Sequence, residues 1–176
     1  MSQSDCHIPS GNNADNRAKE VQLSRPQWEE LLGPERFSIM RKNGTEPPFR
    51  NAYWNEHREG IFVCAGTEVP LFSSENKFDS GTGWPSFSKP VEKGVVAEQV
   101  DHSHGMERRE TYAVACGSHL GHVFSDGPPP TNQRYCINSA CLEFMPLPEG
   151  KSFSEWHQEL AAKARLKIKD LGGEAS

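Results

Sequence analysis

The sequence lacks any long apolar segment and any surplus of positive charge. None of its hydrophobic runs approaches the roughly 18 residues of a membrane span, and Met1–Asn16 has no apolar core typical of a secretory signal. Acidic residues outnumber basic ones by 24 to 19 over 176 residues, for a formal net charge of −5. We therefore expect a cytoplasmic monomer built around one domain, with no affinity for nucleic acid or membranes.

The sequence also lacks the even number of cysteines that a set of disulfides would require. The chain has five, and an odd count without a signal peptide argues against a disulfide framework. It is more typical of one reactive thiol accompanied by unreactive ones. The five are Cys6, Cys64, Cys116, Cys136 and Cys141.

The N-terminal part combines a polar tail with helix signals. Residues 1–20 are rich in Ser, Asn, Gln and Asp, which predicts a disordered tail. Ser24 and Gln27 then form a capping-box pattern, and Asn43-Gly44 is a typical helix stop. Two short helices are expected between these signals, separated by the breaker pair Gly33-Pro34.

The pattern changes to short β-branched and aromatic runs from Gly60 onward. Pro146 and Pro148 close this region, so a domain is expected over residues 21–148, followed by a helical extension over 149–176 whose helix is capped by Ser152 or Ser154. The pattern predicts an α+β, mainly β fold of small helices on one or two antiparallel sheets. The expected strands cover residues 61–64, 94–97, 111–115, 122–124 and 135–137.

One cysteine lies where a thiol can be activated. Cys136 has Arg134 two residues before it and Asn138 two residues after, and in an extended strand the three side chains share one face. A thiol reacts as the thiolate, and a neighbouring cation lowers its pKa from the free value of about 8.5. The amide can bind a developing negative charge or the thiolate. The alternative is that Cys136 is an inert small hydrophobe in a strand.

Two histidines precede this cysteine by a short stretch. Imidazole titrates near neutral pH, so His119 and His122 are both candidate proton donors. Residues three apart point to opposite faces of a straight strand, but Gly121 permits a bend that turns both toward one site. Either histidine is otherwise a hydrogen-bonded core residue. Asp126 either pairs with Arg134 or serves as a turn residue.

Three sequence blocks resemble the signatures of the B-type methionine sulfoxide reductases, and two further blocks upstream support the resemblance. It spans roughly residues 21–148, and blocks of this length in this order are specific. The blocks are GTGWPSF (Gly81–Phe87), SHLGHVFSDGP (Ser118–Pro128) and RYCINSA (Arg134–Ala140), supported by PLFSSENKFDS (Pro70–Ser80) and GTEPPF (Gly44–Phe49).

The resemblance implies a β-tent of two antiparallel sheets and thiol-dependent reduction of methionine-R-sulfoxide in oxidised proteins, a repair reaction without a cofactor. It implies that Cys136 is the nucleophile, His122 the acid and His119 the group that positions the substrate. Trp84, with Phe124, would form the pocket for the S-methyl group; without the family, a core tryptophan is the alternative. Attack leaves a cysteine sulfenic acid, which thioredoxin, glutathione, glutaredoxin or another thiol must reduce.

The chain departs from the family at a metal site. Many members hold a structural zinc with two C-x-x-C pairs, but here Cys64 has Thr67 as its counterpart and Cys116 has Ala113. Two thiols cannot complete a four-ligand site. We predict no metal, with Cys64 and Cys116 facing each other as packed thiols and a disulfide as the alternative.

A second departure concerns recycling of the sulfenic acid. Family members often place a resolving cysteine where this chain has Thr82. Cys141 would lie about 16 Å from Cys136 along an extended strand, whereas a disulfide needs Cα atoms within about 7 Å, so it qualifies only if the strand breaks at Asn138-Ser139. We predict Cys6 of the tail as the resolving cysteine, since long loops close at little extra entropic cost, with an external thiol as the alternative.

Two other functions compete with the reductase. A non-catalytic β-tent module would use the aromatic pocket around Trp84 to hold a small ligand, but it has no need of a thiol beside two histidines. Acyl transfer by a Cys–His pair would want an oxyanion hole opposite the thiol, for which the sequence offers no further signature. The sequence therefore favours the enzyme.

Overall fold

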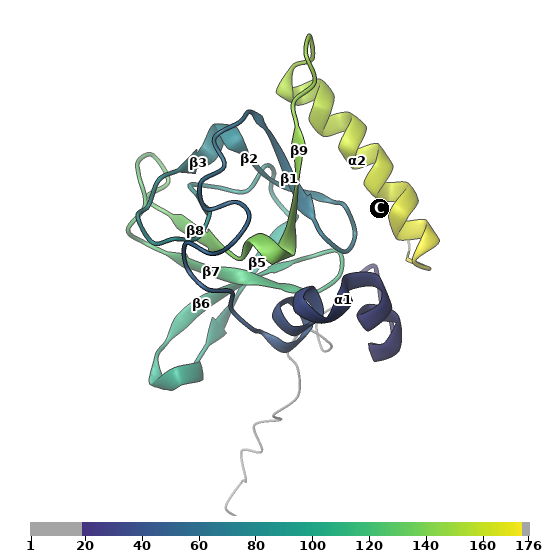
Figure 1. Ribbon diagram of the computed structural model, residues 1–176, viewed down its shortest axis with the longest axis horizontal. Helices are drawn as coiled ribbons and strands as arrows, with labels where there is room; N and C mark the ends of the chain where they lie inside the picture. Colours follow the sequence, from purple (N-terminus) through teal and green to yellow (C-terminus); the bar gives the residue numbers. More distant parts are fainter. Residues whose placement is uncertain (1–18, 174–176) are drawn as a thin grey trace, which may run out of the picture.

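The structure, a computed structural model of residues 19–173, consists of two antiparallel sheets and two main helices (Figure 1). The smaller sheet has the strand order β2-β1-β9 and the larger β3-β4-β8-β7-β6-β5. The predicted α+β, mainly β fold with two antiparallel sheets is confirmed. Cys6 and nearly all of the predicted tail lie outside the described residues. The strands are β1 (Gly60–Cys64), β2 (Pro70–Ser73), β3 (Lys77–Phe78), β4 (Ser86–Phe87), β5 (Val96–Asp101), β6 (Arg108–Ala113), β7 (His119–Phe124), β8 (Arg134–Ile137) and β9 (Leu142–Pro146).

The first helix, α1 (Arg25–Lys42), forms where the capping signals predicted helix. The Ser24 side chain accepts a hydrogen bond from the Gln27 backbone N–H, and the Gln27 side chain accepts one from the Ser24 backbone N–H. Gly33 interrupts the helix with a positive φ of 77°, so α1 consists of two helical stretches that meet in a kink at the predicted break. Asn43 ends it in the left-handed region, as the predicted stop requires.

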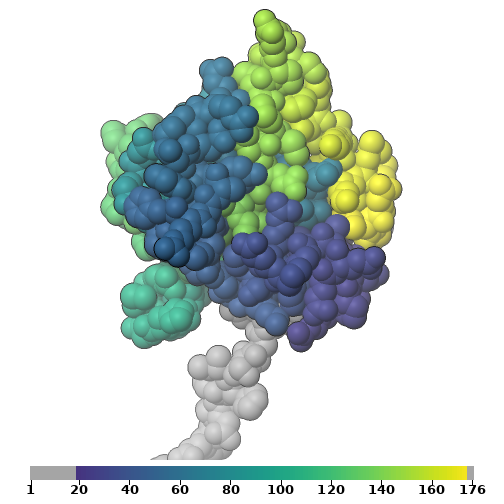
Figure 2. All heavy atoms as spheres, in the orientation of Figure 1, coloured from purple at the N-terminus to yellow at the C-terminus, as the bar shows by residue number. Residues whose placement is uncertain are grey.

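The last helix, α2 (Phe153–Asp170), lies against the small sheet and forms one flank of the molecular surface (Figures 1 and 2). Ser152 caps it through a complete capping box. Leu160 packs with Ile61 and Val63 of β1 on one face, while Phe62 and Cys64 enter the main core on the other. A strand covered on both faces carries an unbroken apolar run, and β1 is buried at all five positions.

Neither of the two long helices in residues 19–173 is apolar enough to cross a bilayer. The predicted strands at residues 61–64, 94–97, 111–115, 122–124 and 135–137 correspond to β1, β5, β6, β7 and β8 with shifted ends. Strands β2, β3, β4 and β9 were not predicted. Two of them have only two residues, too few to show any alternation.

Candidate active site

A cavity of about 120 Å³ opens where β7 and β8 lie side by side. Five of the predicted site residues line it, whereas His119, Arg134 and Asp126 do not. A larger cavity of about 170 Å³ under α2 contains no cysteine or histidine, so the smaller one is the candidate site. Its lining consists of Thr45, Trp84, Arg108, Gly121, His122, Phe124, Cys136, Ile137 and Asn138.

Cys136 is held in the middle of the large sheet. It lies opposite Ser86 of β4 on one side and opposite His122 of β7 on the other. Burial raises the pKa of its thiol above the usual value, while Arg134 and the hydroxyl of Thr82 act in the opposite direction without cancelling that effect. Arg134 thus acts on the pKa in the predicted direction, but the larger effect of burial was not predicted. The thiol is protonated at neutral pH.

Gly121 sets the distance between the two strands. A Cβ atom at this position would collide with the backbone carbonyl oxygen of Cys136, so only glycine lets β7 approach β8 here. The pairing of β6 with β7 also shifts register, because Thr111 lies opposite Gly121 while Tyr112 lies opposite His119. Such a bulge bends β7 between the two histidines, where a bend was predicted, but only His122 lines the cavity.

The bend brings the two imidazole rings to a centroid distance of 5.6 Å, but their surroundings differ. His119 is buried, and its Nδ1 lies 2.9 Å from the buried carboxylate of Glu110. His122 is half-buried and lines the cavity. The proposed substrate-positioning role of His119 stays a prediction, since its ring does not reach the cavity lining.

His122 has a partner that the sequence did not indicate. Its Nε2 lies 2.7 Å from Oδ2 of Asp101, at the end of β5. Burial lowers the pKa of His122, with Asp101 opposing, so the ring is neutral at neutral pH and its Nε2–H can donate to the carboxylate. Burial disfavours ionised Asp101, but hydrogen bonds from His122 and Ser103 hold its pKa below the usual range. No local pattern links residues 21 positions apart.

Arg134 and Asp126 form the predicted ion pair. Arg134 Nε donates to Asp126 Oδ1 at 2.9 Å and Nη2 to Oδ2 at 3.2 Å, a two-pronged geometry. The guanidinium also lies 4.4 Å from the centre of the Phe124 ring. The pair therefore supports an aromatic wall of the cavity from outside, and Asp126 is more than a turn residue.

Asn138 uses both ends of its amide within the protein. Its Nδ2 donates to the carbonyl oxygen of Leu120 at 2.9 Å, and its Oδ1 accepts from the backbone N–H of Glu46 at 3.1 Å. The side chain is buried. Asn138 thus ties together the segments around Cys136, and a hydrogen bond from it to substrate oxygen or to the thiolate stays a prediction.

Trp84 lines the cavity rather than filling the core. It is half-buried, and its indole N–H donates to the carbonyl oxygen of Glu46 at 3.0 Å. The same Glu46 therefore contacts Trp84 and Asn138. Glu46 lies in the block GTEPPF, but the sequence did not indicate a role for it. Its two partners are 38 and 92 residues further along the chain.

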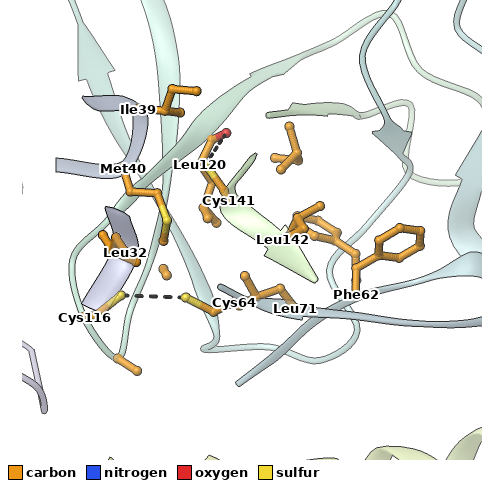
Figure 3. Packing of buried hydrophobic residues seen from close by; sticks show 14 of the residues in the cluster. Leu32, Ile39, Met40, Phe62, Cys64, Leu71, Cys116, Leu120, Cys141 and Leu142 are labelled. Carbon is orange, nitrogen blue, oxygen red and sulfur yellow. Dashed lines mark hydrogen bonds between the residues drawn. The ribbon is translucent and has the colours of Figure 1, made fainter. Parts of the chain in front are cut away.

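The other described cysteines lie in the core (Figure 3). The sulfur atoms of Cys64 and Cys116 are 4.0 Å apart, so the predicted facing of these thiols is confirmed. Within residues 19–173, no three His, Cys, Asp or Glu side chains come together as metal ligands, and the metal-free site stays a prediction. Cys6, the predicted resolving cysteine, lies outside the described residues.

Cys141 corrects the distance argument made from an extended strand. The chain leaves β8 after Ile137 and turns through a short 3-10 helix, Ser139–Cys141, so the strand does break at this point. Cys141 is nevertheless fully buried, with its sulfur donating to the carbonyl oxygen of His119 at 3.2 Å. Burial in the core, and not distance along a strand, separates it from the cavity.

Comparisons of the sequence with known proteins give matches over most of the chain. The family described as "SelR domain" matches residues 32–146. The peptide methionine sulfoxide reductase MsrB of Agrobacterium fabrum is 48% identical over 134 residues, covering 76% of this chain and 99% of that protein. The proteins of the same name from Leptospira interrogans and Thiobacillus denitrificans are 53% and 54% identical, covering 71% and 68% of this chain and 95% and 91% of theirs.

A family match across most of the chain coincides with a thiol, an imidazole and two aromatic walls around one cavity. Relatives at this identity are matched almost from end to end. The chain belongs to the SelR family of B-type methionine sulfoxide reductases.

Proposed function

We propose that this protein reduces methionine-R-sulfoxide residues in oxidised proteins to methionine, with Cys136 as the nucleophile. The observation that carries the proposal is the register of β7 and β8, which places Cys136 directly opposite His122 at the cavity. Trp84 and Phe124 supply aromatic surface for the methyl group of the substrate. The names of the relatives support the same activity.

The reaction at the cavity transfers oxygen from substrate sulfur to Cys136. The Cys136 sulfur attacks the sulfoxide sulfur while the oxygen is protonated, because an unprotonated oxide is a very poor leaving group near neutral pH. The hydroxyl then moves to the Cys136 sulfur as the S–O bond and the new S–S bond break, which releases methionine and leaves a sulfenic acid on Cys136. Methionine sulfur gains two electrons and cysteine sulfur loses two, so the step balances without a cofactor.

His122 can carry the proton from the Cys136 thiol to the sulfoxide oxygen. Since the Cys136 thiol is protonated and His122 is neutral at rest, the thiol proton passes through the imidazole to the sulfoxide oxygen. The carboxylate of Asp101, 2.7 Å from Nε2, stabilises the imidazolium formed in between. The raised pKa of the thiol therefore suits the reaction, because thiol and proton are consumed together.

The sulfenic acid must be reduced after each turnover. Cys64, Cys116 and Cys141 are fully buried, so we propose that the second thiol comes from Cys6, thioredoxin, glutathione, glutaredoxin or another external thiol. Family members often have a cysteine at the position of Thr82, a residue that hydrogen-bonds Cys136 here. We further propose that the protein works as a cytoplasmic monomer without a metal.

The test is turnover of the R and S epimers of N-acetyl-methionine sulfoxide, assayed separately with dithiothreitol. Dithiothreitol replaces the natural reductant, so the assay isolates the chemical step. We expect R-selective turnover in the wild type and none in Cys136→Ser. Absence of turnover of either epimer by the wild type would contradict the proposal and favour a ligand-binding module.

A further inference from the structure

Glu46 is a buried acidic residue that lies next to the cavity without lining it. It is 5% exposed, and its neighbour Thr45 is part of the cavity wall. Burying a carboxyl group costs free energy unless it forms hydrogen bonds. The role of Glu46 therefore follows from what its polar groups contact.

Three polar groups of Glu46 contact three different places around the cavity. Its backbone N–H donates to Asn138, its carbonyl oxygen accepts from the indole of Trp84, and its carboxylate accepts from the backbone N–H of Ala140 at 3.1 Å. Trp84 belongs to one wall, whereas Asn138 and Ala140 directly follow the strand that carries Cys136. Glu46 thus connects the aromatic wall to the nucleophile strand.

The same segment makes further contacts with both sides. Phe49 N–H and Asn51 Nδ2 both donate to the carbonyl oxygen of Gly83, at 2.9 and 2.8 Å, next to Trp84. The Ser139 hydroxyl donates to Asn51 Oδ1 at 2.7 Å. A Cβ at Gly83 would press against Phe49, so the two loops pack without a gap. The segment from Glu46 to Asn51 is therefore a brace between the two walls.

The carboxyl group is the part of this brace that a substitution can remove. The backbone bonds to Trp84 and Asn138 persist in any variant that keeps the segment in place, but only the side chain anchors Glu46 to Ser139 and Ala140. Burial raises the pKa of Glu46 to about 7, so the carboxyl group is partly protonated near neutral pH. Its oxygen can accept a hydrogen bond in the neutral form as well. A glutamine can accept the Ala140 hydrogen bond with the same shape.

We propose that Glu46 is a positioning residue that fixes the spacing between Trp84 and Cys136, and so limits the group on the substrate sulfur to a methyl. This inference rests on the proposed function of the site. A brace of fixed length keeps the Trp84 wall at one distance from the strand that carries Cys136. Loss of the anchor lets the Trp84 wall move outward.

The test compares two substrates that differ by one carbon. Wild type, Glu46→Ala and Glu46→Gln are assayed with the R-sulfoxides of N-acetyl-methionine and N-acetyl-ethionine, and the ratio of kcat/KM for ethyl over methyl is the readout. This ratio does not depend on the fraction of folded enzyme. We expect Glu46→Ala to raise KM for the methyl substrate about tenfold, the effect of one buried hydrogen bond, and to raise the ethyl-to-methyl ratio severalfold.

Two variants serve as references. Glu46→Gln should keep the wild-type ratio, because its amide oxygen can accept from Ala140. Glu143→Ala removes a carboxylate that pairs with Arg36 at 3.0 Å on β9, away from the cavity, and should also keep that ratio. An unchanged ratio in Glu46→Ala, in an active wild-type background, would overturn this inference. An inactive wild type would instead contradict the proposed function.

Discussion

Two groups of cysteines share this fold and differ in access. Cys136 is partly exposed at a cavity beside an imidazole, whereas Cys64 and Cys116 face each other at 4.0 Å in the core, completely buried. The pKa does not separate the groups, because burial raises it for Cys136, and the hydrogen bond between Cys64 and Cys116 lowers it for Cys64 while raising it for Cys116. Access and a proton partner decide which thiol can react.

The sharpest test of this comparison is chemical labelling, and we expect an all-or-none difference. In a Cys6→Ser background, iodoacetamide should modify Cys136 in the folded protein and leave Cys64, Cys116 and Cys141 unmodified. All four should react after unfolding in guanidinium. Peptide mass spectrometry gives the occupancy at each position. Modification of Cys64 or Cys116 in the folded state at the rate of Cys136 would show that access does not distinguish the two groups of cysteines.

Removal of the proton partner should have the next largest effect. Asp101→Asn removes the negative charge next to His122, and we expect kcat with dithiothreitol to fall about 10- to 100-fold. Because Asp101 raises the pKa of His122 against the effect of burial, its loss should shift the acidic limb of the kcat–pH profile to lower pH.

The control for Asp101→Asn is Glu98→Gln. Glu98 lies on the same strand and pairs with Arg109 at 2.9 Å, outside the cavity lining. The Glu98→Gln substitution should leave both kcat and the kcat–pH profile unchanged. A fall in kcat without any shift of the profile would show that Asp101 acts only on the shape of the site.

The smallest effect on activity is expected from a substitution in the buried pair of Cys64 and Cys116. Cys116→Ala removes a sulfur that contacts Cys64 and Ser118 in a packed core, so the free energy of unfolding should fall by about 1–2 kcal/mol. Turnover per folded molecule should stay at the wild-type value. Urea unfolding and the dithiothreitol assay measure the two quantities. A loss of turnover at full stability would connect the pair to the cavity.

Local sequence signals predicted much of this molecule. The capping box at Ser24, the stop at Asn43 and the pairing of Asp126 with Arg134 all join residues within a few positions, and all are present. The grouping of cavity residues came mainly from the family resemblance. Spacing alone placed Arg134, Cys136 and Asn138 on one face. Cys136 and Asn138 line the cavity, although Asn138 lies just beyond the strand, whereas Arg134 does not line it.

What sequence reasoning missed depends on contacts between distant segments. Asp101 comes from the end of β5 and Glu46 from a loop, and no pattern within either segment indicates that it reaches the site. The effect of Arg134 on the pKa of Cys136 was predicted, but the larger and opposite effect of burial was not, because burial is set by distant segments. The turn before Cys141 was likewise treated as extended chain, since a three-residue 3-10 helix leaves no periodicity.

Gly121 has a consequence for how this site tolerates change. Since no Cβ fits against the Cys136 carbonyl, the alignment of the thiol with His122 is a property of two main chains and is independent of either side chain. Side chains facing the cavity can therefore be exchanged singly while the alignment survives. A slip of one residue between the strands, in contrast, would turn Cys136 to the opposite face of the sheet.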